Sequence, residues 1–181
     1  MIFLAKGSYM QAKAYFAQYL IHQAWQQTLL DNQPHKPWSW ADTYPVAKLT
    51  LMKKGQYKQK DGRSLYVLSG TSGRNLAFGP TRVKGGGLDF PQGNRVIAGH
   101  NDTHFSVLNG IESGRIIKFE DANNRVRFYQ VSSTHIVHET DTYVLESNLT
   151  DQLTLITCYP FNSLTPRSEF RLVVSALPLS V

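Results

Sequence analysis

The chain opens with a helical pattern and then changes to a pattern of short strands. From Ser8 to about Leu30, small and apolar residues recur at intervals of three to four, with Gln and Lys between them, which predicts an amphipathic helix. Asp31-Asn32-Gln33-Pro34 ends this helix. The connector 34–40 follows, and its aromatic residues are expected to pin it to the body of the protein. Beyond it, apolar and polar residues alternate in short runs bounded by turn residues.

These runs predict about eight strands, joined by turns rich in Gly, Asn and Pro. The strands are expected at 46–51, 64–68, 95–98, 115–120, 125–131, 135–137, 153–156 and 170–176. Short helical segments are expected at 75–78 and 105–111, and 122–124 forms a hairpin turn. Many short strands after a single helix predict a mainly β fold, a closed or nearly closed β-barrel.

Length and charge narrow the classes of protein that fit. A chain of 181 residues suits one domain, which we divide into an N-terminal helix and connector (1–40) and a barrel domain (41–181). The net charge of +6 comes from Lys and Arg spread along the chain, a pattern typical of solvated surface and not of nucleic-acid binding. No run approaches the ~20 apolar residues that span a bilayer. The apolar opening 1–7 is either an ordinary N-terminus or the remnant of a membrane anchor.

Cys158 is the only cysteine, so an internal disulfide is excluded. It follows the apolar run 153–156 and stands two residues before Pro160, which cannot donate a hydrogen bond to a sheet. The thiol therefore lies at a strand end, next to a forced loop. Such a cysteine is either a half-exposed nucleophile or an inert, buried small side chain.

Two other polar residues stand at or near strand ends. His100 directly follows the strand 95–98 and Gly99, and Arg171 lies at the start of the strand 170–176. Strand ends on one rim of a barrel converge even when they are distant in sequence. A cysteine and a histidine together are the usual components of an activated sulfur nucleophile, and an arginine can hold a developing oxyanion.

The sequence around these residues resembles that of the sortases, which are cysteine transpeptidases of bacterial cell surfaces. Val-Ile-Ala-Gly-His ends at His100, Leu-Thr-Leu-Ile-Thr-Cys ends at Cys158, and an arginine stands in a strand 13 residues beyond the cysteine. The resemblance covers residues 46–176. Cys158-Tyr159-Pro160-Phe161 and the Trp-rich stretch 36–41 are similar to the sortase group of Gram-negative proteobacteria.

The resemblance implies a closed eight-stranded barrel and a set of site residues. It implies Cys158 as the nucleophile, His100 as the general acid and base, and Arg171 as the clamp for the oxyanion or substrate. Arg171 is preferred over Arg167 because Arg171 lies inside a strand pattern, as the family's arginine does. No cofactor is expected. The residues expected to bind substrate or to support the site are Ala98, His104 and Thr157.

The resemblance also implies partners and a location. The expected substrate is a protein with a C-terminal sorting signal similar to Leu-Pro-x-Thr, and the acyl group passes to an amine acceptor at the cell envelope, or to water. No nucleic acid is expected as a partner. An N-terminal anchor is expected to hold the protein in the inner membrane, with the catalytic domain in the periplasm.

Two other functions fit the residues. His100, Asp102 and His104 alternate along an extended segment and could hold zinc for a hydrolase, with a further ligand from His135 or His138. The second alternative is a non-enzymatic envelope barrel that binds peptide or glycan while its thiol is buried and silent.

Overall fold

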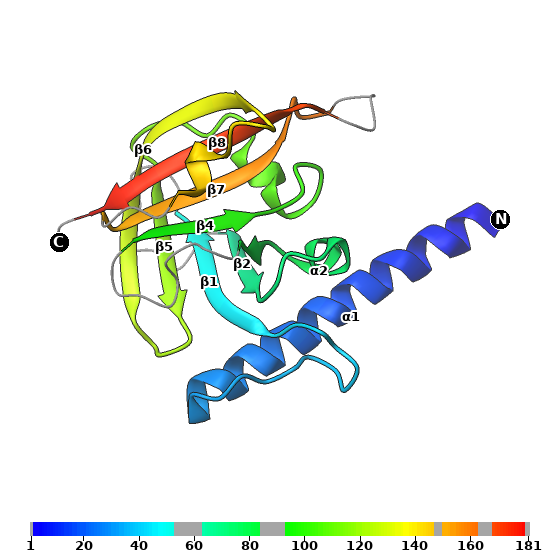
Figure 1. Cartoon of the computed structure of the whole chain (residues 1–181). Coiled ribbons are helices and arrows are strands. Elements are labelled where there is room, and N and C mark those ends of the chain that lie inside the picture. The colour runs from blue at the N-terminus through cyan, green and yellow to red at the C-terminus, as the bar shows by residue number, and fades with distance from the viewer. Residues whose placement is uncertain (1, 53–62, 84–92, 147–149, 163–167, 180–181) are drawn as a thin grey trace.

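A barrel stands beside a long helix in the computed structural model, which describes residues 2–52, 63–83, 93–146, 150–162 and 168–179 (Figure 1). The helices are α1 (Ile2–Asp31), α2 (Gly73–Phe78) and the 3-10 segments η2 (His104–Leu108) and η3 (Thr142–Leu145). The strands are β1 (Pro45–Leu51), β2 (Arg63–Leu68), β3 (Thr81–Arg82), β4 (Asn94–Ala98), β5 (Ile116–Asp121), β6 (Val126–His138), β7 (Gln152–Tyr159) and β8 (Phe170–Pro178).

The eight strands of the described residues close into a barrel in the order β1-β2-β3-β4-β7-β8-β6-β5. The predicted mainly β fold with an eight-stranded closed barrel is therefore confirmed. Most neighbours are antiparallel, but β2 pairs with β3 and β4 pairs with β7 in parallel. The parallel pairing of β4 with β7 brings the residues that follow β4 beside the end of β7.

Apart from shifts of one to three residues at the strand ends, the strands differ from the predicted ones in two places. The predicted strands 125–131 and 135–137 form the single strand β6, because a register shift between Val131 and Ser133 lets its pairing with β8 continue. The two-residue strand β3 has no counterpart in the prediction, since two residues are too few for a hydrophobic period to be visible. The helix α1 begins at Ile2, earlier than the predicted Ser8.

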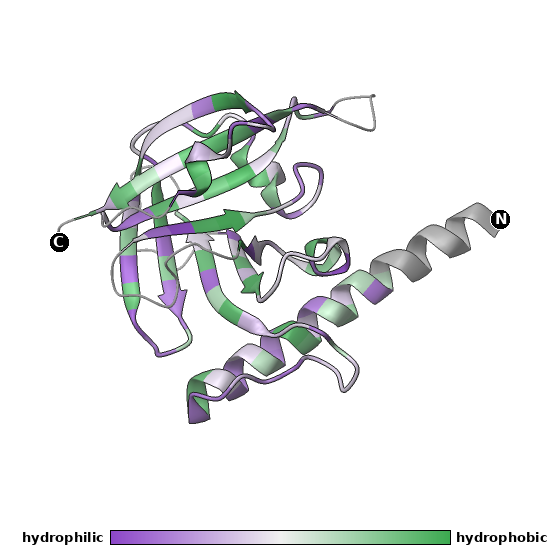
Figure 2. Cartoon of the chain, viewed as in Figure 1, coloured by the Kyte–Doolittle hydropathy of each residue, from purple (hydrophilic) through white to green (hydrophobic). Residues whose placement is uncertain are grey.

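The barrel is filled by alternate residues of its strands, as the period of two in a strand requires. Aromatic residues from β5 and β6 fill its middle, where the rings of Phe119 and Tyr129 meet edge to face. Figure 2 shows hydrophobic residues along β4, β7 and β8, and hydrophilic ones at the turn between β5 and β6. This packed interior fixes the strands whose ends carry the candidate chemistry.

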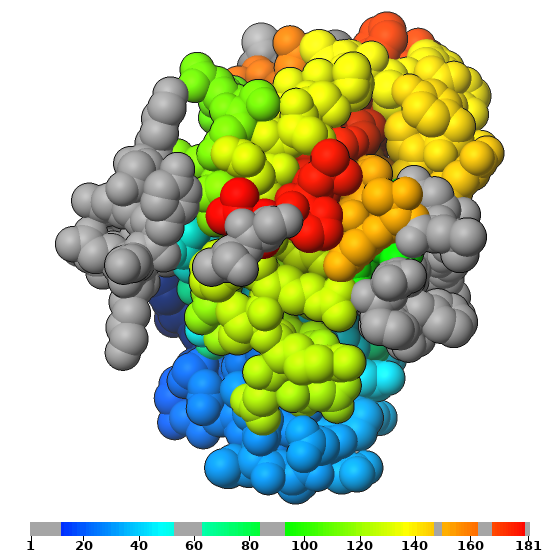
Figure 3. All heavy atoms as spheres, turned by 90° about the vertical axis from the view of Figure 1, so that its left-hand side faces the viewer, coloured from blue at the N-terminus to red at the C-terminus, as the bar shows by residue number. Residues whose placement is uncertain are grey.

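The C-terminal half of α1 packs on the barrel, whereas the N-terminal half projects beyond it (Figure 1). Ile21 and Trp25 are buried, and the side-chain amide of Asn124 donates a hydrogen bond to the Leu29 carbonyl at 3.1 Å. Figure 3 shows the β5–β6 turn resting on this end of the helix. None of the helices in the described ranges combines the length and the apolar character needed to cross a membrane.

The connector after α1 is attached through one of its two tryptophans. The ring of Trp38 meets the ring of Phe78 edge to face, with 5.1 Å between centroids. Trp40 is 82% exposed, so the expectation that the aromatic residues as a group pin the connector is wrong for this one.

Candidate active site

The neighbouring strands β4, β7 and β8 present the candidate residues on the outer face of the barrel. Leu155 of β7, Ile97 of β4 and Leu172 of β8 point into the core. Because successive side chains of a strand point to opposite faces, Cys158 and Arg171 point outward. Cys158 is half-buried and carries a free thiol, as expected for a reactive cysteine and not for a core one.

Cys158 and Arg171 are direct cross-strand partners in the antiparallel pair β7–β8. Residues opposite each other in such a pair have Cβ atoms about 5 Å apart and lie on the same face of the sheet. The sulfur and the base of the arginine side chain are therefore neighbours by register. No loop conformation is needed to bring them together.

His100 is brought to this place by hydrogen bonds on either side of it. The Gly99 N–H donates to the Ile156 carbonyl at 3.1 Å, and the Thr157 hydroxyl donates to the Gly99 carbonyl at 2.7 Å. The Asn101 side-chain amide donates to the Pro160 carbonyl at 3.1 Å. The segment 99–101 thus runs beside 156–160, with the exposed imidazole of His100 next to the end of the strand that carries Cys158.

The guanidinium group of Arg171 is held by three acceptors. Nη2 donates to Oε2 of Glu139 at 2.6 Å, and Nη1 donates to the Ser168 and Phe170 carbonyls at 2.5 and 2.9 Å. This side chain is 27% exposed, so it stays accessible from the outer face. Arg167, the alternative arginine, lies outside the described residues.

A cavity of about 370 Å³ continues the outer face toward the start of β7. It is lined by residues of β4, β6, β7, β8 and η3, among them Asn94, His135, Tyr143, Thr154, Val173 and Ser175. Thr154 lies four residues before Cys158 and on the same face, about 13 Å away at the rise of a strand. An extended peptide of a few residues can therefore reach from this cavity to the thiol.

The supporting residues lie on both sides of the sheet. Ala98 is the last paired residue of β4, opposite Ile156 in β7. Thr157 is 2% exposed, and its hydroxyl contacts the backbone that precedes His100. His104 begins η2 and interacts electrostatically with His100, and burial lowers the pKa of its imidazole despite a hydrogen bond with the Ala77 backbone.

The arrangement gives no support to a metal centre. Among the side chains in the described ranges, no three of His, Cys, Asp and Glu converge as metal ligands. His104 contacts the backbone of α2, and His135 and His138 belong to β6, across β7 and β8 from His100. The alternative with His100, Asp102 and His104 as zinc ligands therefore lacks the required cluster.

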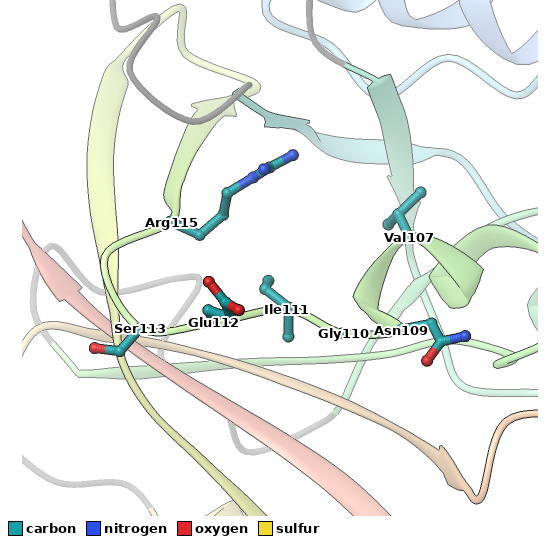
Figure 4. Close-up of a pocket in the computed structure, with 7 residues that line it drawn as sticks. All are labelled: Val107, Asn109, Gly110, Ile111, Glu112, Ser113 and Arg115. Atoms are coloured by element: carbon teal, nitrogen blue, oxygen red, sulfur yellow. The ribbon is translucent and has the colours of Figure 1, made fainter.

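Two cavities lie apart from this outer face. One of about 940 Å³ separates α1 from α2 and from the loop after His100, and His104 borders it. A smaller one of about 160 Å³ lies in the loop between η2 and β5, where Val107, Ile111 and Arg115 line it (Figure 4). His100, Cys158 and Arg171 line neither cavity.

Glu139 and Asn101 are the two site neighbours that the sequence did not indicate. Glu139 belongs to no motif, and it meets Arg171 only because β6 and β8 pair across 32 residues of chain. Asn101 had a usable signal, since it directly follows His100 and amides often hold loops by bonding to backbone.

Comparisons with known proteins agree with the geometry. A family model described as the sortase domain matches residues 59–179. A search of curated proteins finds no match. Among solved structures, sortase C-1 from Actinomyces oris is 25% identical with a TM-score of 0.62, and the match covers 76% of each chain.

Two further solved structures cover more of the chain. Sortase A from Corynebacterium diphtheriae, a lid mutant, is 20% identical with a TM-score of 0.63, over 91% of this chain and 94% of that one. A sortase D5 transpeptidase from Clostridium perfringens is 20% identical with a TM-score of 0.62, over 88% and 89%. With the family model matching about two thirds of its length, the chain belongs to the sortase family, a family of cysteine transpeptidases.

Proposed function

We propose that this sortase cleaves a C-terminal sorting signal similar to Leu-Pro-x-Thr and transfers the acyl group to an amine, or to water in a slower reaction. The observation that carries the proposal is the register of β7 and β8, which sets Cys158 opposite Arg171, together with the hydrogen bonds that set His100 beside them. Each residue type supplies one of the functions that acyl transfer through sulfur needs.

In the first half-reaction the Cys158 thiolate attacks the carbonyl carbon after the threonine of the signal. The Arg171 guanidinium donates to and stabilises the oxygen of the tetrahedral intermediate. The C–N bond then breaks, and His100 in its protonated form gives a proton to the departing amine. A thioester on Cys158 remains.

In the second half-reaction the acceptor amine attacks the thioester carbonyl. His100, now neutral, takes the proton that the amine loses, and the C–S bond breaks to release the thiolate. The cycle returns each group to its starting protonation state. None of these steps calls for a cofactor.

We place the donor peptide along the outer face of β4, β7 and β8, from the 370 Å³ cavity to Cys158. The side-chain amide of Asn94 donates to the Val144 and Glu146 carbonyls, which holds η3 over this face as a wall. An extended peptide with a proline loses little conformational freedom on binding there.

Incubation of the purified protein with a peptide that contains such a signal, in the presence of a triglycine amine, tests the function. Mass spectrometry is expected to find the ligated product and a thioacyl adduct on Cys158. Cys158→Ala should lose both, whereas Cys158 in the native protein should react with mild alkylating agents. A Cys158→Ala protein that still cleaves the peptide would end the proposal. A peptide with the threonine replaced serves as the substrate control.

We also propose membership of the Gram-negative proteobacterial sortase group, with an N-terminal anchor in the inner membrane and the barrel in the periplasm. The similarity of the sequences 36–41 and 158–161 to those of this group supports the membership. The projecting half of α1, with exposed Tyr15 and Phe16, supports a membrane-proximal position, since amphipathic rings such as that of tyrosine favour the interface. Fractionation of host cells followed by protease treatment of spheroplasts tests this, and recovery of the protein in the cytosol would contradict it.

A further inference from the structure

A further polar side chain, that of Glu139, lies on the outer face directly beside the three that the reaction uses. The strand order β4-β7-β8-β6 sets the lateral order of His100, Cys158 and Arg171, and the end of β6 comes next. Glu139 directly follows β6, and its backbone N–H donates to the Glu169 carbonyl at 2.7 Å. This bond extends the β6–β8 ladder by one step, so Glu139 is fixed relative to Arg171.

The carboxylate of Glu139 is the only charged partner of Arg171 among the described residues. Its Oε2 lies 2.6 Å from Nη2, and the two side chains are 27% and 47% exposed. With the two carbonyls on Nη1, three of the five N–H groups of the guanidinium are engaged. The other two N–H groups have no acceptor among the described residues and can donate to the carbonyl oxygen of a bound substrate.

A long arginine side chain that is free in solvent samples many rotamers. If it must be ordered during the reaction, the entropy that is lost raises the activation free energy. In this structure the guanidinium is held without a substrate, because Glu139 contacts one side of it while the Ser168 and Phe170 carbonyls contact another. A donor that is fixed beforehand stabilises a developing oxyanion without reorganisation.

We propose that Glu139 is a positioning residue for Arg171 in acyl transfer, an inference that rests on the proposed function. It contacts no reacting atom and acts through the arginine. In the opposite role Glu139 would withhold Arg171 from the substrate, and removing its charge would raise kcat instead of lowering it. The kcat of a Glu139→Gln protein therefore distinguishes the two roles.

The test compares Glu139→Gln with the wild-type protein in steady-state peptide transfer. The amide lacks the charge that orders the guanidinium, and kcat is expected to fall about tenfold while KM changes less than twofold. Glu169→Gln is the matched control, because that side chain is 75% exposed and its carboxylate lies 3.8 Å from the His138 imidazole, away from the Arg171 guanidinium contact. This control is expected to keep the wild-type kcat and KM.

A double variant separates positioning from a general structural effect. In an Arg171→Lys background the forked donor is already lost, so Glu139→Gln should cause no further drop in kcat. Additive losses would overturn the proposal, and so would a Glu139→Gln protein with an unchanged or raised kcat/KM. Melting temperatures of all variants establish that the comparison is between folded proteins.

A second readout does not depend on activity. In ¹⁵N NMR of the wild-type protein, the Nη nitrogens of Arg171 are expected to give separate signals, assigned by their loss in Arg171→Lys, because the contacts hinder rotation. In Glu139→Gln they should average. If the wild-type protein transfers no peptide, the proposed function fails. The Nη signals would still show whether Glu139 holds the Arg171 guanidinium in place. Identical signals in both proteins would overturn the inference.

Discussion

The Thr157 hydroxyl donates a hydrogen bond to the Gly99 carbonyl at 2.7 Å, so the residue before the candidate nucleophile holds the residue before the candidate acid and base. The contact is buried and spans 58 residues of sequence. It aligns two strand ends whose outward side chains, Cys158 and His100, are the ones proposed to react.

Thr157→Val should therefore impair both stability and turnover. Valine has nearly the same shape, but it leaves the buried carbonyl without its donor, at a cost of about 1–3 kcal/mol. We expect a lower free energy of unfolding in urea titrations and a kcat reduced at least fivefold, since small displacements of reacting groups are costly. Thr157→Ser keeps the hydroxyl and should stay near wild type. Wild-type turnover in the valine variant would contradict the alignment role.

Gly99→Ala should disturb the same segment from the other side. A Cβ at this position would stand 2.9 Å from ring carbons of Phe105, which is fully buried and has no room to retreat. Overpacking of this kind costs about 1–3 kcal/mol, and the adjoining His100 should shift with it. Gly73→Ala is the control, because its Cβ would meet no atom within 4 Å. Thermal melts and peptide-transfer rates measure both effects, and equal behaviour of the two variants would refute the prediction.

Asp151→Asn should be the most destabilising of these changes. Asp151 receives hydrogen bonds from Tyr129 at 2.8 Å, from Arg127 at 2.7 Å and from the buried guanidinium of Arg95. Neutralising it removes this carboxylate from the buried Arg95 guanidinium, and losing one partner of a buried ion pair costs about 3 kcal/mol.

Asp121→Asn is the matched control for this charge removal. Its partner Arg125 is 57% exposed, and such a surface pair contributes about 1 kcal/mol or less. At the Asp151 site itself, burial of the Tyr129 side chain and its hydrogen bond to the Asp151 carboxylate raise the pKa of Tyr129 to about 12. The tyrosine hydroxyl therefore stays a donor throughout the neutral range. Equal losses of unfolding free energy in both Asn variants would contradict this account.

His104 should make the folded protein sensitive to mild acid. Burial disfavours its imidazolium form, so the pKa of His104 in the folded protein lies below the ordinary value of 6.5, with Arg63 and His100 lowering it further and Asp102 opposing them. Below pH 6.5 the unfolded chain binds a proton that the folded chain does not. The free energy of unfolding therefore decreases as the pH is lowered from 6.5, until the pH has passed below the pKa of the folded state.

In His104→Gln this contribution is absent. The difference in unfolding free energy between pH 8 and pH 5 should be smaller in the variant than in the wild-type protein, as urea titrations at the two pH values can measure. The same difference in both proteins would show that the imidazole is not desolvated as the structure indicates.

The barrel could be predicted from the sequence because its turns and alternating runs are local signals. The strand break after Cys158 could be predicted as well, since Pro160 ends β7 by its own chemistry. The merging of two predicted strands into β6 could not, because the shift between Val131 and Ser133 depends on pairing with β8. Trp40 was misjudged for a related reason: an aromatic residue in a connector packs only where the fold supplies a partner.

In the candidate site too, local sequence motifs could be recognised, whereas contacts that depend on strand pairing could not. The motifs around His100 and Cys158 identify both residues and their positions at strand ends. The partner of Arg171 is invisible in the sequence, because Glu139 is one of many acidic surface residues until β6 and β8 pair. Contacts made by register across distant strands require the assembled sheet.

The parallel seam between β4 and β7 has a consequence for the newly made chain. Parallel neighbours cannot be joined by a tight turn, and here the intervening chain includes the whole β5–β6 hairpin. The imidazole and the sulfur thus depend on a long-range strand pairing, a kind of contact that is slow to form in folding. In a chain whose β4–β7 seam has not formed, the thiol is not beside the imidazole that would activate it, so acyl transfer reports that this part of the fold is complete.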